Sequence, residues 1–299
     1  MSTVIDKTYD AIEVRPLGSV LGAEIDGVDL SSPLSDKAID EIRRAAAEHC
    51  VVVLRGQSLD IQQYEAFAKQ LGSLYTQSLG FGAIDTRTEG ITVLDAPAFK
   101  GRGEGWHVDE LWTDTPPSLA MLRAAELPGK GGDTMFASMY AAYDELSPPM
   151  QRFVEPLTAE YNTGGVVEGA IRRLRLLGND DSPEATEKRQ RYGEVRAKAE
   201  TMLPAHHPLV RVHPLTGRKH LYFSRNAISH VVELTRPESA SLLDFLNRHV
   251  ESVQFQYRNS WELGKIALFD ERCTQHCVVP DYEGRRLVWR AYMGAEQPA

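Results

Sequence analysis

The amino-acid sequence predicts a mixed α+β fold whose second half is an antiparallel barrel or jelly roll. Amphipathic helical segments and one short apolar run occupy the first part of the chain. Many short strand-like runs, without alternating helices, fill the second half. The Thr216-Gly217 pair lies between two of these runs and predicts a hairpin turn.

Three helices are expected from periodicity and end signals. Residues 35–49 carry apolar side chains at helical spacing, and residues 60–72 do the same before stopping at Gly72. The run VVVL (51–54) between them is expected to be a buried strand. The sequence TRPE (235–238) is a capping box with proline in the first turn, so it opens a third helix.

The remaining regular elements are expected to be strands. Their ranges are 118–125, 208–214, 219–224, 253–259, 265–270 and 286–293. Two long segments, 76–105 and 162–204, fit no strand pattern, and the second is charged and partly helical. Segments of this kind are lids in some enzymes and solvated surface excursions in others.

Composition limits the class of protein. The chain has 299 residues, 42% hydrophobic composition and a net charge of -9, which is globular and argues against a nucleic-acid partner. It contains no apolar run of the roughly 18 residues that a membrane span needs, and its start has no secretory pattern. Three cysteines indicate a reducing, cytoplasmic setting. The CTQHC run (273–277) has no second cysteine pair to complete a structural zinc site.

The stretch GEGWHVDELW (103–112) places His107 and Asp109 two positions apart. In a strand both side chains would point to the same face, as two of the three ligands of a facial metal site. The alternative is a surface loop with scattered polar residues. Of the nine histidines, His276 is the candidate third ligand, because it follows a predicted strand and precedes an arginine-rich run.

That run, RRLVWRAYM (285–293), has two distinct faces if it is a strand. Arg286, Val288, Arg290 and Tyr292 share one face, and the apolar residues between them share the other. Either the arginines face water, or the strand is buried on both faces and the arginines require anionic partners. Periodicity alone leaves both interpretations open.

Several sequence blocks resemble the taurine dioxygenase family of Fe(II)/2-oxoglutarate-dependent oxygenases. The blocks, in chain order, are PLGSVLGAEIDGVDL (16–30), WHVD (106–109), GGDT (131–134), AAYDELS (141–147), HPLVRVHPLTGRK (207–219), FDERCTQH (269–276) and DYEGRRLVWR (281–290). The resemblance implies one domain over residues 1–299, with a double-stranded β-helix (jelly roll, cupin-like) core, flanking helices and a poorly matched lid insertion at about 160–205. It also implies a homodimer or homotetramer.

The resemblance implies the residues of the site. His107, Asp109 and His276 resemble the two-histidine, one-carboxylate triad that holds Fe(II) and leaves positions for 2-oxoglutarate and O2. Thr134 and Arg286 resemble the residues that bind the distal carboxylate of 2-oxoglutarate. Arg290 resembles the arginine that holds the anionic group of the substrate.

The sequence contains a register ambiguity and four departures from the family pattern, of which Phe269 in place of a tryptophan keeps an aromatic side chain. Arg285 and Arg286 are both candidates for the cosubstrate arginine, and only Arg286 lies four residues before Arg290, as in the family. Glu271 replaces the family asparagine. Gln77 replaces a histidine that contacts the sulfonate of taurine, and Gly103 replaces an asparagine that places its amine. Gln77 still donates a hydrogen bond but carries no charge, which argues against taurine as substrate.

The expected function is hydroxylation of a small anionic organic molecule beside a heteroatom, followed by fragmentation. We expect a carboxylate with an ether-linked group to fit best, as in aryloxyalkanoates, followed by alkyl sulfates; sulfonates belong to the same type. One alternative is an oxygenase on the same scaffold acting on an amino-acid or natural-product intermediate. Others are a non-catalytic cupin-like binding protein and a zinc hydrolase, although a hydrolase has no need of the paired arginines and Thr134.

Overall fold

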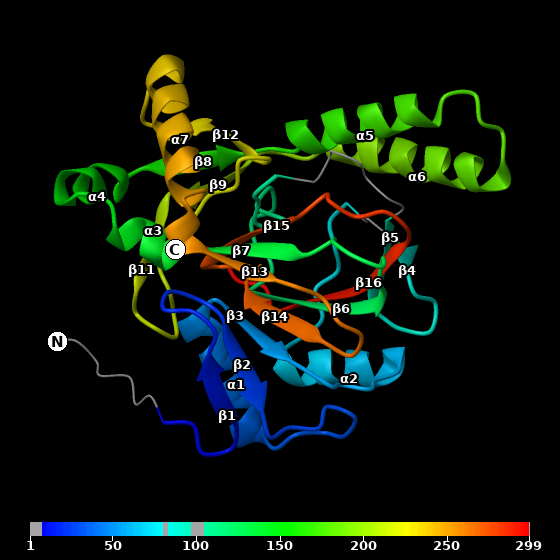
Figure 1. Ribbon diagram of the computed structural model, residues 1–299. Helices are drawn as coiled ribbons and strands as arrows, with labels where there is room; N and C mark the ends of the chain where they lie inside the picture. The colour runs from blue at the N-terminus through cyan, green and yellow to red at the C-terminus, as the bar shows by residue number, and fades with distance from the viewer. Residues whose placement is uncertain (1–7, 80–82, 97–104, 299) are drawn as a thin grey trace.

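The computed structural model describes residues 8–79, 83–96 and 105–298, and it is a mixed α+β fold. An eight-stranded sheet crosses the molecule in the order β1-β2-β3-β14-β6-β16-β5-β4 (Figure 1). Its strands are β1 (Glu13–Pro16), β2 (Ala23–Asp26), β3 (Val51–Leu54), β4 (Ala83–Ile84), β5 (Thr92–Ala96), β6 (Leu119–Glu126), β14 (Ile266–Asp270) and β16 (Arg286–Met293). Neighbouring strands are antiparallel except for the parallel pair β2 and β3.

Three smaller sheets complete the β structure. A three-stranded sheet, β13-β7-β15, contains β13 (Gln256–Asn259), β7 (Thr134–Ser138) and β15 (Thr274–Val278). A second, β12-β8-β9, contains β12 (Ile228–Val231), β8 (Thr158–Tyr161) and β9 (Ala205–Pro208). The hairpin of β10 (Val210–Val212) and β11 (Lys219–Leu221) turns through Gly217 at φ +68°, which confirms the predicted turn.

Helices α1 (Asp36–His49) and α2 (Ile61–Leu71) cover the outer face of the large sheet. Ser35 and Asp60 cap their first turns by accepting from backbone N–H groups, as expected for these residue types. Their apolar faces pack on alternate residues of the sheet strands, including Met121 in β6 and Met293 in β16. Both predicted helices and the predicted strand between them are confirmed.

The inner face of the large sheet forms a second core with the β13-β7-β15 sheet. Phe136 of β7 packs here with Phe269 of β14 and Val288 of β16. The two ring centroids of Phe136 and Phe269 are 5.1 Å apart. Strand β16 is therefore covered on both sides: α2 lies against one face, and the small sheet lies against the other.

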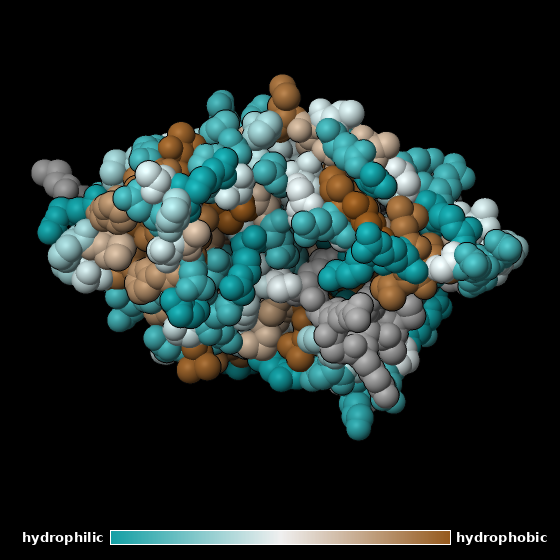
Figure 2. Space-filling view, turned by 90° about the horizontal axis from the view of Figure 1, so that it is seen from above, coloured by the Kyte–Doolittle hydropathy of each residue, from teal (hydrophilic) through white to brown (hydrophobic). Residues whose placement is uncertain are grey.

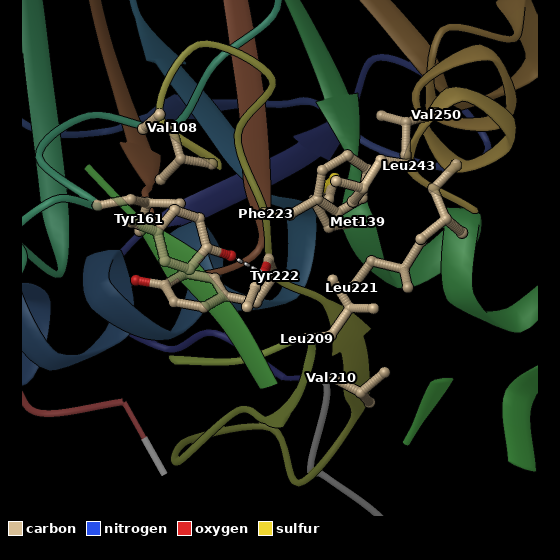
Figure 3. Close-up of a cluster of buried hydrophobic side chains, with 14 of the residues drawn as sticks. Val108, Met139, Tyr161, Leu209, Val210, Leu221, Tyr222, Phe223, Leu243 and Val250 are labelled. Carbon is tan, nitrogen blue, oxygen red and sulfur yellow. Dashed lines mark hydrogen bonds between the residues drawn. The ribbon is translucent and has the colours of Figure 1, made fainter. Parts of the chain in front are cut away.

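A third core lies under α7 (Arg236–Val250) and the β12-β8-β9 sheet (Figure 3). The Tyr161 hydroxyl donates to the carbonyl of Tyr222 at 2.8 Å inside it. The short helices α3 (Met139–Asp144) and α4 (Pro148–Val154), and the 3-10 turn η1 (Val253–Phe255), border this core. The capping box predicted for α7 is present.

Helices α5 (Gly164–Leu177) and α6 (Pro183–Ala199) form a hairpin between β8 and β9. The turn between them, residues 178–182, is exposed, and this end of the molecule is mostly hydrophilic (right edge of Figure 2). The charged segment 162–204 thus contains two helices. None of the described helices is both long and apolar enough to cross a membrane.

Three predicted strand ranges are wrong. The run 208–214 is split between the end of β9 and the separate strand β10, and the run 253–259 begins as η1 before β13. The strand expected over 219–224 ends at Leu221. The strands that were not predicted, all of them five residues long or shorter, are β1, β2, β4, β5, β7, β8, β12 and β15. Of these, β4 and β5 lie in the segment 76–105, which was expected to fit no strand pattern, so that expectation is wrong.

Candidate metal centre and cosubstrate site

His107 and Asp109 are brought to one side by a turn, and the segment is not the regular strand that would place both side chains on one face. His107 forms a single β-bridge with His276, in which each backbone N–H donates to the carbonyl of the other, at 3.0 and 2.9 Å. The chain turns immediately afterwards, and Glu110 has φ +60°. Between the two polar residues, Val108 is buried in the third core (Figure 3), and its N–H donates to Ser224 Oγ at 3.2 Å.

His276 lies within β15, where the sequence placed it just past a strand. It is paired with Phe136 in β7, and its ring centroid is 4.8 Å from that of Phe269 in β14. The imidazole is therefore held between the two sheets, at the edge of the inner core.

The three side chains meet at a spacing that fits a shared cation. His107 Nε2 is 3.6 Å from Asp109 Oδ1, and His276 Nε2 is 3.6 Å from Asp109 Oδ2. The ligand atoms of His107, Asp109 and His276 all lie within 4.8 Å of one another, which is close enough to share one metal ion. The His107 Nδ1 lies 2.7 Å from the carbonyl of Gly105, which can only accept, so the proton is on Nδ1 and the lone pair of the imidazole is on Nε2, the atom that lies beside Asp109.

The charges of the group suit metal binding at neutral pH. Burial opposes ionisation of Asp109, but His276, Arg290 and His107 outweigh it and hold the pKa of this carboxyl well below its usual range. Burial, together with His107, lowers the pKa of His276 to about 3. The carboxylate is thus ionised and the His276 imidazole neutral, which are the forms that bind a metal.

Arg286 and Thr134 lie together beside this group. Arg286 is 7% exposed, its Nη2 donates to Thr134 Oγ1 at 3.5 Å, and its Nε donates to the carbonyl of Gly132 at 3.0 Å. Trp261 Nε1 also donates to Thr134 Oγ1, at 3.1 Å. Within the described part of the chain, Arg286 forms no ion pair with a carboxylate, and burial lowers its pKa. A buried guanidinium in this state fits an anionic ligand.

The two candidate cosubstrate arginines have different surroundings. Arg285 is on the surface, where it pairs with Asp95 at 2.9 Å and Glu126 at 3.0 Å. Arg286 faces the inner core with Val288. The interpretation in which the arginine face of β16 is buried agrees with the structure, and the water-facing alternative does not.

Arg290 lies beside the metal group, and Gln77 lies on a segment that contacts the adjoining turn. Arg290 Nη1 is 3.9 Å from Asp109 Oδ2, and its guanidinium lies over the Tyr292 ring at 4.8 Å. Gln77 precedes Ser78, whose N–H donates to Glu110 Oε2 at 2.9 Å, so its segment is tied to the turn that holds Asp109. The Gln77 Oε1 atom is buried and has no hydrogen-bond partner in the described structure. Gly103 lies outside the described residues.

Three residues at the site were not assigned a role from the sequence. Tyr292 donates to Asp109 Oδ2 at 2.6 Å, and Trp261 contacts Thr134 as described above. Glu271 is buried and accepts from the N–H of Asp109 at 3.3 Å; burial and the charge of Asp109 raise its pKa well above the usual range. The signal for Tyr292 was its place on the arginine face of β16, whereas nothing in the local pattern points to Trp261.

Comparison with known proteins identifies the family. The model of the taurine catabolism dioxygenase TauD, TfdA family matches residues 13–292. The chain belongs to this family. It is therefore an Fe(II)- and 2-oxoglutarate-dependent dioxygenase, with Fe(II) as cofactor and 2-oxoglutarate and O2 as cosubstrates.

Relatives in the TauD, TfdA family cover nearly the whole chain. A sulfate ester dioxygenase of Pseudomonas putida is 31% identical over 290 residues, or 96% of this chain and 91% of that protein. A 2,4-dichlorophenoxyacetate dioxygenase of Cupriavidus pinatubonensis is 31% identical over 285 residues, or 89% of this chain and 91% of that protein. The crystal structure of a taurine dioxygenase from Burkholderia xenovorans is 29% identical, with a TM-score of 0.76 over 96% of this chain and 90% of that one.

Proposed function

We propose that His107 Nε2, Asp109 and His276 Nε2 hold Fe(II), and that Arg286 and Thr134 hold the distal carboxylate of 2-oxoglutarate. Two imidazoles and one carboxylate are the donor set that non-haem Fe(II) oxygenases use. Thr134 opposes Val278 in β15, two residues from His276, so the anion site is displaced roughly 7 Å along the strand from the metal ligand. This offset suits a short dicarboxylate that reaches from the metal to Arg286.

In this proposal the residues of the chain orient the metal ligands and supply the positive charge of the anion site. Bound Fe(II) supplies the activation of O2, in which 2-oxoglutarate is oxidised to succinate and CO2 and one oxygen atom enters the substrate. Tyr292 fixes one carboxylate oxygen of Asp109, and the carbonyl of Gly105 fixes the ring of His107. Trp261 and Arg286 donate to the same Thr134 oxygen from two sides.

We further propose that the substrate is a small organic anion hydroxylated at a carbon that bears an ether or ester oxygen. The single observation that carries this is Arg290, a mostly buried guanidinium beside the metal group on the same face of β16 as Arg286. Gln77 adds a neutral polar group on the neighbouring segment. The activities of the sulfate ester and 2,4-dichlorophenoxyacetate dioxygenases support this substrate class. Hydroxylation beside the oxygen gives a hemiacetal-type product, which breaks to a carbonyl compound and the released sulfate or phenol.

We also propose that residues 1–299 form one domain around a double-stranded β-helix. In support, the chain passes between the two sheets that enclose the inner core: β6 to β7, β13 to β14, β14 to β15 and β15 to β16. The family model matches the single range 13–292, which includes the α5–α6 hairpin. In this proposal the hairpin is the lid insertion.

The test is substrate-dependent succinate formation across alkyl sulfates, aryloxyalkanoates, sulfonates, amino acids and neutral ethers. We expect turnover of alkyl sulfates or aryloxyalkanoates to exceed that of taurine. Arg290→Ala is expected to raise the KM for the anionic substrate, with Arg285→Ala, a surface residue just before the same strand, as control. A neutral or amino-acid substrate turned over best would refute the substrate proposal.

A further inference from the structure

A row of three metal-ligand residues, Glu160, His206 and His230, crosses the β12-β8-β9 sheet outside the metal centre described above. Glu160 in β8 is paired with His206 in β9 on one side and with His230 in β12 on the other. Directly paired residues project from the same face of a sheet, so the carboxylate lies between the two imidazoles. His206 Nε2 is 3.7 Å from Glu160 Oε2, and His230 Nδ1 is 3.5 Å from Glu160 Oε1.

A β-bulge is responsible for this row. Ile228 is paired with Tyr161, but the next pair joins His230 to Glu160, so Ser229 is an extra residue in β12. Without the bulge, Ser229 would lie opposite Glu160 and no second imidazole would face the carboxylate. Bulges commonly re-aim a side chain in this way.

The row lies on the outer face of the sheet. On the opposite face, Ala159, Tyr161 and Val231 are buried in the third core. In the row itself, the side chains of Glu160 and His230 are 22% and 16% exposed, and that of His206 is 51% exposed. Among the ion pairs of the described residues, those of Glu160 are with these two histidines alone. The carboxylate is therefore not neutralised by a lysine or arginine.

We propose that Glu160, His206 and His230 bind a divalent transition-metal ion of the Zn²⁺ class. Imidazole nitrogens and a carboxylate are ordinary ligands of such ions, and water completes the coordination of an open three-residue site. The nitrogen–oxygen separations are 3.7 and 3.5 Å, but the two imidazoles approach different oxygens of the carboxylate. The three ligand atoms are therefore less closely gathered than those of the His107, Asp109 and His276 group, and in this proposal the half-exposed His206 ring rotates inward when the ion binds.

The bound ion would link the strands at the base of the α5–α6 hairpin. Strand β8 leads into α5 and β9 follows α6, so a cation shared by Glu160 and His206 joins the two ends of the hairpin. His230 adds the third strand (Figure 1, where β8, β9 and β12 lie beside α7). A ligand that binds only the folded sheet raises the apparent melting temperature as its concentration rises.

The experiment counts Zn²⁺ bound to metal-free full-length protein by equilibrium dialysis and elemental analysis. Two equivalents are expected for the wild type, one at each group. One equivalent is expected for His206→Ala, His230→Ala and Glu160→Gln. His49→Gln, which removes an imidazole from α1, is the matched control and should retain two.

Measurements of activity and thermal melting distinguish a metal ion bound at Glu160, His206 and His230 from one bound at the His107, Asp109 and His276 group. The three variants should keep wild-type turnover with Fe(II) and 2-oxoglutarate, and should lose the part of the Zn²⁺-induced Tm increase that the second equivalent produces. His206→Ala changes a half-exposed side chain, so it tests the site even where His230→Ala fails to fold. A single equivalent in the wild type would overturn the proposal, and so would a second equivalent that survives both His206→Ala and Glu160→Gln.

Discussion

Tyr292 donates a hydrogen bond to Asp109 Oδ2 at 2.6 Å, on the same oxygen that faces His276. The contact holds the carboxylate in the orientation that the metal needs. Partners of this kind typically contribute about 10- to 100-fold in metal affinity or activity.

We expect Tyr292→Phe to weaken Fe(II) binding by about this factor while the fold persists, because only one hydroxyl is lost. The measurement is an anaerobic Fe(II) titration of the metal-free protein. Tyr64→Phe is the matched control, since the Tyr64 hydroxyl is also buried but donates to the backbone of Met121 at 2.7 Å. Equal metal affinity in the wild type and Tyr292→Phe would contradict this role.

Arg286 and Arg285 are adjacent in sequence, but Arg286 is buried and Arg285 is on the surface. The effects of replacing each with alanine can therefore be compared. Arg286→Ala is expected to raise the KM for 2-oxoglutarate much more than the KM for the substrate. Removing one partner of a buried charge pair costs about 2–5 kcal/mol, or roughly 30-fold or more in affinity. Arg285→Ala removes only surface ion pairs with Asp95 and Glu126 and should change neither constant. The reverse result would show that the cosubstrate arginine was wrongly chosen.

At the scale of elements, the loop before β7 shapes the anion site. Gly132 has φ +75°, and a Cβ atom there would lie 3.1 Å from Arg286 Cδ and 3.2 Å from Tyr282 Cδ1. An alanine at this position both strains the backbone and pushes on the guanidinium.

We expect Gly132→Ala to raise the KM for 2-oxoglutarate by roughly tenfold, since overpacking costs about 1–3 kcal/mol. Gly27→Ala is the control, because Gly27 has a similar φ of +82° but nothing lies within 4 Å of the added atom. Both variants should lose stability in urea denaturation through backbone strain, Gly132→Ala more than Gly27→Ala because it is also overpacked, and only Gly132→Ala should change the KM. A changed KM in Gly27→Ala would mean that general destabilisation is the cause.

Elements with a strong local pattern were predictable from the sequence. Helices α1, α2 and α7 have apolar stripes and caps, and the alternation in β16 predicted which side chains share a face. The turn that places Asp109 was not predictable, because it depends on Val108 packing in a distant core and on the bridge to His276. The contact between Trp261 and Thr134 joins residues 127 positions apart, which no local spacing reveals. The resemblance to the family, and not periodicity, selected Thr134, whereas the position of His276 after a predicted strand and before the arginine-rich run had already indicated it as a ligand.

A second buried group of ligand-type residues stabilises the fold of the whole molecule and does not bind a metal. His213, Asp270 and Cys273 lie close together, but both oxygens of Asp270 accept from Arg272, at 2.8 and 2.6 Å. His213 Nε2 is 3.1 Å from Asp270 Oδ2. The guanidinium takes the place that a metal ion would need, so we interpret this group as a structural ion pair.

The buried ion pair of Asp270 and Arg272 predicts that the free energy of unfolding falls at acid pH. Burial alone would raise the pKa of Asp270, but Arg272 and His213 hold it well below its usual range. A depressed carboxyl pKa stabilises the fold fully above the pKa of the unfolded chain, about 3.9, and this stabilisation is lost as the pH falls further. Asp270→Asn should therefore lower the free energy of unfolding at pH 7 by about 3–5 kcal/mol, and should flatten its decline below pH 4.

The measurement for Asp270→Asn is urea denaturation of the metal-free protein between pH 3 and pH 7. Asp85→Asn is a suitable control, because the low pKa of Asp85 comes mainly from its contacts with the exposed Arg87. Wild-type stability and slope in Asp270→Asn would refute the structural role of the pair.

If His107, Asp109 and His276 hold one Fe(II) ion to which 2-oxoglutarate binds, the complex should absorb visible light. The measurement is the visible absorption band that 2-oxoglutarate produces when it chelates Fe(II) in the absence of O2. We expect the band in the wild type at one iron per chain, and we expect it to be lost in Asp109→Ala and His276→Ala and with Zn²⁺ in place of Fe(II). No band in the wild type, or an undiminished band in Asp109→Ala, would contradict the assignment.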